Sequence, residues 1–395
     1  MSADRTEAAS AGPAPAGPPR QGPVRAAVKR LLAAHASPAG LGWAVAAGVF
    51  LGCTPLYGLQ IALCLLVAWL FRLNKVATLV GVQISTPPLT AVILYAEVQL
   101  GEYLLRGRFL GFAFDAFRGL EAVAIARSVL GAWVLGSVVV GAVLGAGFGL
   151  LTWAVARRRH LELLAPEVRA ARPRAAARYA AASPRDRHYA RLKYRLDPAY
   201  LLAADALRSI ATRPEATVGD LGCGRGLLAV LLVEAGAEAQ VVGLDWDEAG
   251  LATARAAARD LPRVRFEHAD LTSDAPPACT GAALVDVLHY HPPDVQDAIL
   301  ARVAAALAPG GRLVVREADA DERMLLARLF ESWGARLGWH RVAGRFHYRP
   351  AAALQGLLEA AGFTVTIKPA GGFLHRANVL LVADRPAAAT RVPQA

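Results

Sequence analysis

The stretch Asp220-Leu-Gly-Cys-Gly-Arg-Gly226 combines a carboxylate with three glycines at two-residue spacing, Gly222, Gly224 and Gly226. Glycine lets a backbone approach a ligand closely, and backbone N–H groups at the start of a helix bind anions. A short apolar run precedes this stretch and a helical pattern follows it, so we expect a loop between a strand and a helix. Such a turn alone is a weak signal, and it lacks the GxGxxG spacing typical of dinucleotide-dependent dehydrogenases.

Three further aspartates follow the next predicted strands in order. Asp245 ends a strand 25 residues after Asp220, where its carboxylate could accept both hydroxyls of a ribose. Asp270 follows the third strand, and Asp286 ends the fourth. Ligands bind at the carboxyl ends of the strands in such sheets, so the four acids are expected to line one site.

Short apolar runs alternate with helical stretches throughout this half of the chain. The predicted strands are residues 217–221, 241–244, 264–268, 282–286, 312–316, 364–367 and 378–383. The predicted helices are residues 227–235, 249–260, 293–308 and 351–361. This alternation predicts an α/β domain with a Rossmann-like, doubly wound and mostly parallel sheet.

With these motifs the second half resembles the class I S-adenosylmethionine-dependent methyltransferases over about residues 190–383. The motifs are Asp220–Gly226, Gly243-Leu-Asp245, Ala269-Asp270-Leu271, Asp286-Val-Leu-His289-Tyr290 and Leu307-Ala-Pro-Gly-Gly-Arg-Leu313, in the order expected for that family. The resemblance implies methyl transfer with S-adenosyl-L-methionine as the cofactor.

The resemblance also implies a role for each residue of the cofactor site. These residues are Asp220, Gly222, Cys223, Gly224, Gly226, Asp245, Trp246, Asp270, Leu271 and Asp286. The glycines would make room for the cofactor, with Asp220 and Asp286 near its methionyl end. Asp245 would bind the ribose beside Trp246, and residues 270–271 would bind the adenine.

An oxygen acceptor also needs a base, most often His, Asp or Glu. The candidate catalytic residues are His289, Tyr290 and Glu317, which come after the fourth and fifth strands, and His289 is the best placed. The alternatives are a histidine bonded to backbone at a helix start, and a Glu317 that pairs with Arg316 or Arg323.

The segment Trp333–Tyr348 is rich in aromatic and basic residues. We expect it to cover the acceptor pocket, or else to pack as a loop on the sheet edge. The motifs Tyr189–Tyr200, Asp245-Trp-Asp247, Val285–Tyr290 and Arg316–Asp319 also resemble methyltransferases of bacterial aryl polyene and related lipid gene sets. This narrower resemblance implies an aromatic or lipid-linked acceptor.

The composition separates the chain from a purely soluble protein. Of its 395 residues 55% are hydrophobic and 19% are charged, with a mean hydropathy of +0.35, whereas soluble domains are about 25% charged. These values exclude a disordered chain. Four cysteines without a CxxC pair or a Cys/His cluster exclude a disulfide framework and predict no metal site.

Three long stretches of the first half contain no charged residue. They are Leu41–Phe71, Val76–Ala96 and Ser128–Ala156, with 31, 21 and 29 residues. A helix needs about 20 apolar residues to cross a bilayer, so the stretches predict an all-α transmembrane domain. Pro55 interrupts the first stretch, and Pro87-Pro88 interrupts the second. A proline leaves a backbone carbonyl without its helical hydrogen bond, and lipid cannot satisfy that carbonyl, so these breaks must be buried in protein or line a cavity.

The third stretch carries Gly141, Gly145 and Gly149 on one face. Small residues at this spacing let a neighbouring helix approach, so this face could join copies of the chain. Basic residues precede the first stretch and follow the last, which places both flanks in the cytoplasm. An even number of crossings results if Leu41–Phe71 is a re-entrant hairpin folded at Cys53–Gly58.

Residues 35–156 resemble a bacterial membrane family known as domain of unknown function 2062. The resemblance rests on Ser37-Pro38, the glycine- and proline-spaced run Gly48–Gly58, Asn74 and Thr86-Pro87-Pro88. Members of that family usually have Asn-Pro where this chain has Pro87-Pro88. The resemblance implies a multi-pass location in the bacterial inner membrane and carries no known activity.

Residues 157–195 hold 12 Lys and Arg against three acids. Such a charge suits nucleic acid or anionic lipid. Directly after a membrane stretch, lipid headgroups are the preferred partner, at about 1 kcal/mol per basic residue near the surface. We expect no nucleic-acid partner.

The chain is therefore predicted to contain five segments. These are a disordered tail with a short basic helix (1–34), the membrane domain (35–156), a basic connector (157–195), the methyltransferase domain (196–384) and a second tail (385–395). The expected function is a membrane-tethered methyltransferase that acts at the cytoplasmic face on a lipid-linked or aromatic acceptor. The alternatives are a transporter or scaffold regulated by a cofactor-binding module, and a domain that binds the cofactor without chemistry. The lack of charge in the three stretches argues against a transporter.

Overall fold

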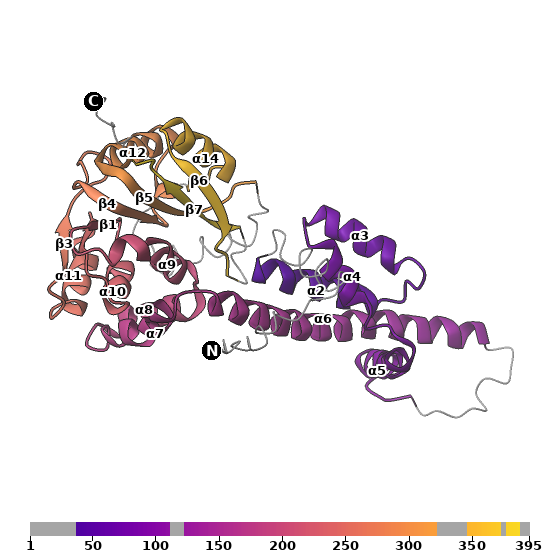
Figure 1. Ribbon diagram of the computed structural model, residues 1–395. Helices are drawn as coiled ribbons and strands as arrows, with labels where there is room; N and C mark the ends of the chain where they lie inside the picture. Colours follow the sequence, from indigo (N-terminus) through magenta and orange to yellow (C-terminus); the bar gives the residue numbers. More distant parts are fainter. Residues whose placement is uncertain (1–36, 111–121, 322–345, 373–376, 388–395) are drawn as a thin grey trace, which may run out of the picture. The chain divides into compact units, whose positions relative to one another are not determined.

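The computed structural model describes residues 37–110, 122–321, 346–372 and 377–387 (Figure 1). The helical first half and the sheet-containing second half are described separately.

The described residues of the first half form five helices. They are α2 (Pro38–Gly52), α3 (Gln60–Leu70), α4 (Lys75–Val82), α5 (Pro87–Arg106) and α6 (Ala122–Glu162). Two of the motif residues begin helices, because the Ser37 hydroxyl accepts from Gly40 N at 2.9 Å and the Asn74 side chain accepts from Ala77 N at 2.9 Å. Side-chain oxygens at these positions satisfy N–H groups that a helix leaves without a partner.

Only α6, among the described residues, is long and apolar enough to cross a membrane, over Val129–Glu162. The other two predicted membrane stretches are each divided between two helices, one with a break at residues 53–59 and one at 83–86. The sequence predicted that Pro87 and Pro88 interrupt a membrane helix. In the structure they instead form the first turn of α5. Proline suits the first turn because its missing N–H would have no intrahelical partner there.

Glycines bring the helices of the first half into backbone contact. A Cβ at Gly145 or Gly149 would collide with Ala46 of α2, and one at Gly141 would be in tight contact with Phe50 at the end of the same helix. This face therefore has an intramolecular partner, and it is not the exposed surface expected for joining copies. A Cβ at Gly136 would overlap the carbonyl oxygen of Glu97 in the same way.

Helix α5 carries two carboxylates that the apolar stretches did not include. Glu97 and Glu102 are both buried, and Glu97 Oε2 accepts from Trp133 Nε1 of α6 at 2.8 Å. Arg106 and Arg108 form ion pairs with Glu102. The first half is thus not free of buried charge, although residues 76–96 are.

The second half is built on a seven-stranded sheet of order β3-β2-β1-β4-β5-β7-β6 (Figure 1). The strands are β1 (Thr217–Leu221), β2 (Gln240–Asp245), β3 (Val264–His268), β4 (Cys279–Val285), β5 (Leu307–Ala318), β6 (Thr364–Pro369) and β7 (Asn378–Asp384). The helices are α7 (Pro166–Ala177), α8 (Pro184–Leu196), α9 (Ala199–Ala211), α10 (Leu227–Glu234), α11 (Glu248–Ala257), α12 (Pro293–Ala306) and α14 (Ala351–Ala360). All neighbouring pairs are parallel except those of β7, which runs antiparallel to β5 and β6.

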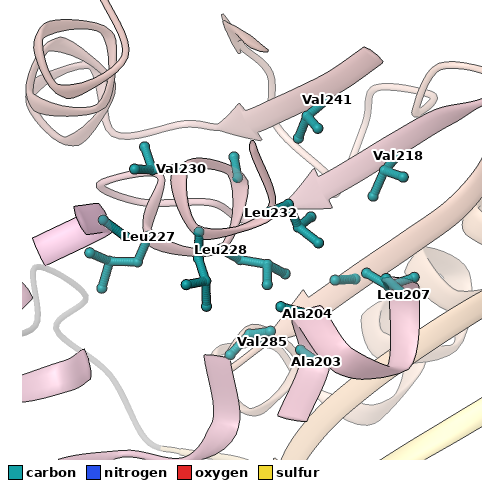
Figure 2. Packing of buried hydrophobic residues seen from close by; sticks show 14 of the residues in the cluster. Ala203, Ala204, Leu207, Val218, Leu227, Leu228, Val230, Leu232, Val241 and Val285 are labelled. Carbon is teal, nitrogen blue, oxygen red and sulfur yellow. The ribbon is translucent and has the colours of Figure 1, made fainter. Parts of the chain in front are cut away.

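Alternate residues of the strands enter two separate hydrophobic cores. In β5, Val314 packs into a core with α9 and α10, whereas Leu313 and Val315 pack into a core with α12 and α14. Figure 2 shows part of the first core, to which Leu228 of α10, Leu207 of α9 and the strand residue Val218 all contribute. Helices thus cover both faces of the sheet, and the predicted doubly wound, mostly parallel fold is confirmed.

Two helices of the predicted connector belong to this domain. Val168 and Ala171 of α7 and Tyr194 of α8 are buried in the same core as α9 and α10. Their apolar side chains, spaced three and four residues apart, form the inner face of each helix. The packed domain therefore begins near Leu164 and not at residue 196 as predicted.

The close contact of α5 with α6 predicts different effects of alanine substitution at two glycines of α6. Gly136→Ala should lower the melting temperature of the detergent-solubilised protein by several degrees, because the new methyl group meets the Glu97 backbone. Gly131 has open space around it, so Gly131→Ala should be neutral or stabilising, since alanine favours helix by about 1 kcal/mol over glycine. Equal melting temperatures for the two variants would contradict the contact.

Candidate cofactor and acceptor site

The loop between β1 and α10 requires its glycines. Gly222, Gly224 and Gly226 all have positive φ, at 76°, 53° and 71°, a region that L side chains disfavour. A Cβ at Gly226 would also approach the Phe266 ring to 2.5 Å, whereas the position above Gly224 is open space. The loop thus exposes backbone at a point where a ligand can approach.

Asp245, at the carboxyl end of β2, is hydrogen-bonded to the glycine loop that follows the neighbouring strand β1. One carboxylate oxygen accepts from Gly224 N at 2.7 Å and the other from Asp247 N at 2.8 Å. The pKa of Asp245 is raised overall, because the effect of burial exceeds that of these two hydrogen bonds, which lower it. Each oxygen keeps a second lone pair for a ligand hydroxyl. The indole of the following Trp246 is 53% exposed and can stack on a planar ligand.

Asp220 is directed into the protein. Its Oδ2 accepts from Ala229 N of α10 at 3.1 Å, and the residue is only 3% exposed. Burial, with the nearby Asp245, raises the pKa of Asp220 to about 7. The structure therefore gives Asp220 a role in holding α10 behind the glycine loop.

Asp270 is exposed at the end of β3, where its Oδ1 accepts from Thr272 N at 2.8 Å. This hydrogen bond lowers the pKa of Asp270. Leu271 is buried beside it. An ionised carboxylate next to an apolar side chain is the combination expected for adenine recognition, and that role stays a prediction.

Asp286 lies in a cluster of four charged side chains after β4. Its backbone has a φ of 60°, which is rare for a residue other than glycine. The carboxylate forms ion pairs with Arg316 and, at 3.4 Å, with Lys193 of α8. Asp197 is 3.0 Å from Lys193 and 3.5 Å from Arg316. Although burial opposes it, Arg316 and Lys193 hold the pKa of Asp197 well below its usual range.

The cluster contains residues that were not predicted from the sequence. Lys193 and Asp197 lie within the Tyr189–Tyr200 motif, but that motif gave no reason to place them beside β4. Arg316 is 6% exposed, and its Nε has no hydrogen-bond partner among the described residues. A buried donor of this kind is available to a ligand.

His289 and Glu317 form a buried hydrogen-bonded pair. His289 Nδ1 lies 2.7 Å from Glu317 Oε2, and Glu317 Oε1 accepts from Val287 N and Leu288 N at 3.1 and 2.7 Å. Burial would raise the pKa of Glu317, but His289 and the backbone donors lower it, so the carboxylate is ionised. The carboxylate therefore accepts a hydrogen bond from Nδ1–H, and in this tautomer of the neutral imidazole Nε2 is the basic nitrogen. Glu317 thus pairs with His289 and not with Arg316.

Aromatic rings surround this pair. The centroid of the His289 ring lies 4.3 Å from that of Tyr290, 5.6 Å from that of Phe346 and 5.3 Å from that of Tyr348. His347 N donates to His289 O at 2.8 Å. The end of the predicted covering segment therefore reaches the candidate catalytic residues, while residues 333–345 lie outside the described ranges, as does Arg323.

The burial of Asp220 predicts a stability that depends on pH. Because its pKa is raised to about 7, the folded state binds this proton more tightly than the unfolded chain, and the stabilisation is lost as the pH rises from about 4 to 7. Asp220→Asn should therefore melt at a higher temperature than the wild type at pH 8, with the difference shrinking towards pH 4. Glu215→Gln, at an exposed carboxyl, is the control. A less stable Asp220→Asn at pH 8 would contradict the assignment.

Two family models match the chain. "Uncharacterized protein conserved in bacteria (DUF2062)" matches residues 22–162, and "Methyltransferase domain" matches residues 218–311. The second range includes the glycine loop and the carboxyl ends of β1 to β4, but neither Lys193 nor Glu317.

Curated relatives match less than half of the chain. A trans-aconitate 2-methyltransferase of Methylobacterium nodulans is 37% identical over 174 residues, which cover 42% of this chain and 64% of that protein. A demethylspheroidene O-methyltransferase of Rhodobacter capsulatus is 30% identical over 174 residues, covering 44% of this chain and 42% of that protein. The chain thus spans less than two thirds of the length of either relative.

Among solved structures, the magnesium protoporphyrin IX methyltransferase of Synechocystis PCC 6803 with bound SAH is 22% identical. The match covers 47% of this chain and 81% of that one, with a TM-score of 0.38. From the two family matches, the chain joins a DUF2062 region to a methyltransferase domain of the S-adenosylmethionine-dependent class.

Proposed function

We propose that this protein is a membrane-tethered methyltransferase that acts at the cytoplasmic face on a hydroxyl of an aromatic or lipid-linked acceptor. The observation that carries the proposal is the buried His289–Glu317 pair beside the glycine loop. Val287, two residues before His289, lies against this loop, since a Cβ at Gly222 would approach its Cγ2 to 2.5 Å. A base therefore lies next to the place where a cofactor can bind.

The residues of the loop region fit S-adenosylmethionine. Asp245 can accept the ribose hydroxyls, and the exposed indole of Trp246 offers a flat surface for adenine. The zwitterionic methionyl end needs both charges, which the Asp286 and Arg316 cluster supplies. When bound, the cofactor supplies an electrophilic methyl group on its sulfonium.

In the proposed reaction His289 acts as the general base. Its Nε2 takes the proton of the acceptor hydroxyl while Glu317 holds the ring through Nδ1 and stabilises the charge that develops on it. The buried surroundings exclude water and strengthen this ion pair. The proton then leaves to solvent when the products dissociate.

The presence of a base argues for a hydroxyl acceptor. A carboxylate, such as the trans-aconitate in the name of one relative, is ionised at neutral pH and needs no proton removed. The rings of Tyr290, Phe346 and Tyr348 around His289 favour a flat or apolar acceptor. The name of the other relative assigns its methyl transfer to oxygen.

The first half supports the tether. Helix α6 is long enough to span a bilayer, and its C-terminal turns carry the basic residues Arg157, Arg158 and Arg159. Helix α3 is too short to cross, at about 1.5 Å per residue, yet its apolar side chains are exposed, with Trp69 at 68% and Ile61 at 61%. Such a surface suits lipid. Anchoring raises the effective concentration of the enzyme near a membrane-borne acceptor.

One observation favours a second candidate function, in which the first half is a transporter or scaffold and the second half regulates it. Glu97 is 1% exposed, and its Oε1 has no hydrogen-bond partner among the described residues. A buried ionisable side chain next to a membrane helix is a common mark of an ion or substrate pathway.

The base assignment predicts a large effect on turnover alone. His289→Ala should lower kcat by about 10²–10⁴ and leave the affinity for S-adenosylhomocysteine within about twofold in calorimetry. Glu317→Gln should also lower kcat, because an amide cannot stabilise an imidazolium. His291→Ala, outside the pair, is the control and should keep wild-type turnover. Wild-type turnover in His289→Ala would remove it as the base.

The ribose assignment predicts a loss of cofactor affinity. Asp245→Ala should weaken S-adenosylhomocysteine binding by tenfold or more, or about 1.4 kcal/mol, because two ligand hydrogen bonds and the support of Gly224 are lost. Asp247→Asn changes a carboxylate two residues away and keeps the oxygen that caps α11, so its affinity should match the wild type. Unchanged affinity in Asp245→Ala would defeat the assignment.

The acceptor class can be tested in native membranes. Incubation with methyl-labelled S-adenosylmethionine should place the label in the organic extract, where mass spectrometry would identify the product. Label confined to protein or nucleic acid would overturn the acceptor argument. Cofactor binding without any label, together with a solute flux that Glu97→Gln abolishes, would favour the second candidate.

A further inference from the structure

Helix α8 holds the glycine loop with one of its faces. Asp186 Oδ1 accepts from Arg225 Nε of the loop at 2.5 Å, and the Arg225 guanidinium lies 4.6 Å from the centroid of the Tyr189 ring. Tyr194 Oη donates to Leu227 O at 2.7 Å, just after the loop. These contacts connect α8 to both ends of the Arg225–Leu227 segment, so the position of α8 affects the shape of the loop.

The opposite face of α8 is basic and partly apolar. Its exposed residues are Arg185, His188, Arg191, Leu192, Arg195 and Leu196. At 100° per residue they occupy about 140° of the helix, while Asp186, Tyr189 and Lys193 lie on the other side. Leu192 and Leu196 are 38% and 47% exposed. The single acid of the helix is Asp186, which is already paired with Arg225.

This outer face matches the surface of an anionic bilayer. Arginines pair with phosphate groups, and leucines between them can enter the boundary between headgroups and acyl chains. A nucleic acid would satisfy the arginines but not the exposed leucines. Helix α6 ends at Glu162, and α8 begins at Pro184, so a spanning α6 would keep α8 near the membrane.

We propose that the outer face of α8 docks on an anionic lipid surface, and that this contact stabilises the glycine loop held by its inner face. The membrane then regulates the cofactor site: the loop is best ordered, and binds the cofactor most tightly, when α8 lies on lipid. The coupling is reciprocal, so the cofactor also strengthens the lipid contact. This inference rests on the proposed tether and cofactor site.

The docking is tested by fluorescence. The four native cysteines are buried, so an environment-sensitive dye on Leu192→Cys of the full-length protein reports on α8. In nanodiscs, its emission should shift to the blue with phosphatidylglycerol and not with phosphatidylcholine alone. An unchanged spectrum, or a shift produced by RNA but not by anionic lipid, would overturn the docking surface.

The coupling is tested by calorimetry with S-adenosylhomocysteine in the same nanodiscs. The wild-type affinity should be at least threefold higher with phosphatidylglycerol. The triple variant Arg185→Gln, Arg191→Gln, Arg195→Gln should lose this difference and keep the affinity seen in phosphatidylcholine. The matched control Arg208→Gln, Arg213→Gln, Arg259→Gln removes the same charge from other exposed positions and should keep the difference.

Two further results distinguish a failure of the coupling from a failure of the cofactor assignment. Equal wild-type affinities in the two lipids, with the dye shift present, would show that α8 docks without affecting the loop. No binding in either lipid would defeat the cofactor assignment itself, while the dye would still report on the docking surface.

Discussion

The parallel pairing of β1 with β2 on one side and β4 on the other decides where the chemistry of this protein lies. It brings Asp220 level with Gly243 and Ala283, so that residues from distant parts of the sequence end at one edge of the sheet. The backbone bonds of Gly222 N and Cys223 N to Leu244 O then fix the glycine loop to the end of β2. Without this pairing, Asp245 could not reach Gly224, and the residues that follow β4 would not lie beside the glycine loop.

The sequence was sufficient to predict the sheet, because its strands are short apolar runs bounded by glycines and acids. Most predicted strands lie within a residue or two of the observed ones, whereas β5 begins five residues earlier than expected, at Leu307, within the stretch assigned to a helix and turn. The glycine loop was predictable because its φ angles need glycine. His289 was predictable as a candidate from its place after a strand. Its pairing with Glu317 was not, since 28 residues separate them and several cations were equally plausible partners.

The parts that could not be predicted depend on tertiary packing. Hydropathy alone could not distinguish one membrane helix from two short helices, because Pro87 and Pro88 are compatible with either a kink or a helix start. The high charge of residues 157–195 suggested a solvated connector. Its small and aromatic residues, such as Ala171 of α7 and Tyr194 of α8, instead form the buried faces of two helices. The glycines of α6 were correctly expected to allow close packing, but a sequence does not say whether the neighbouring helix belongs to the same chain.

The attachment of α8 to Arg225 has a consequence for how this domain can be recombined. Family boundaries drawn around the sheet begin at residue 218, yet the glycine loop is held from outside by Tyr179, Asp186 and Tyr194. A gene fusion that joined a new anchor directly to β1 would leave the loop without these supports and expose the core surface that α7 and α8 cover. The unit that can be transferred intact therefore begins near Leu164, and helices α7 and α8, which look like a linker in the sequence, must accompany the methyltransferase domain in any new fusion.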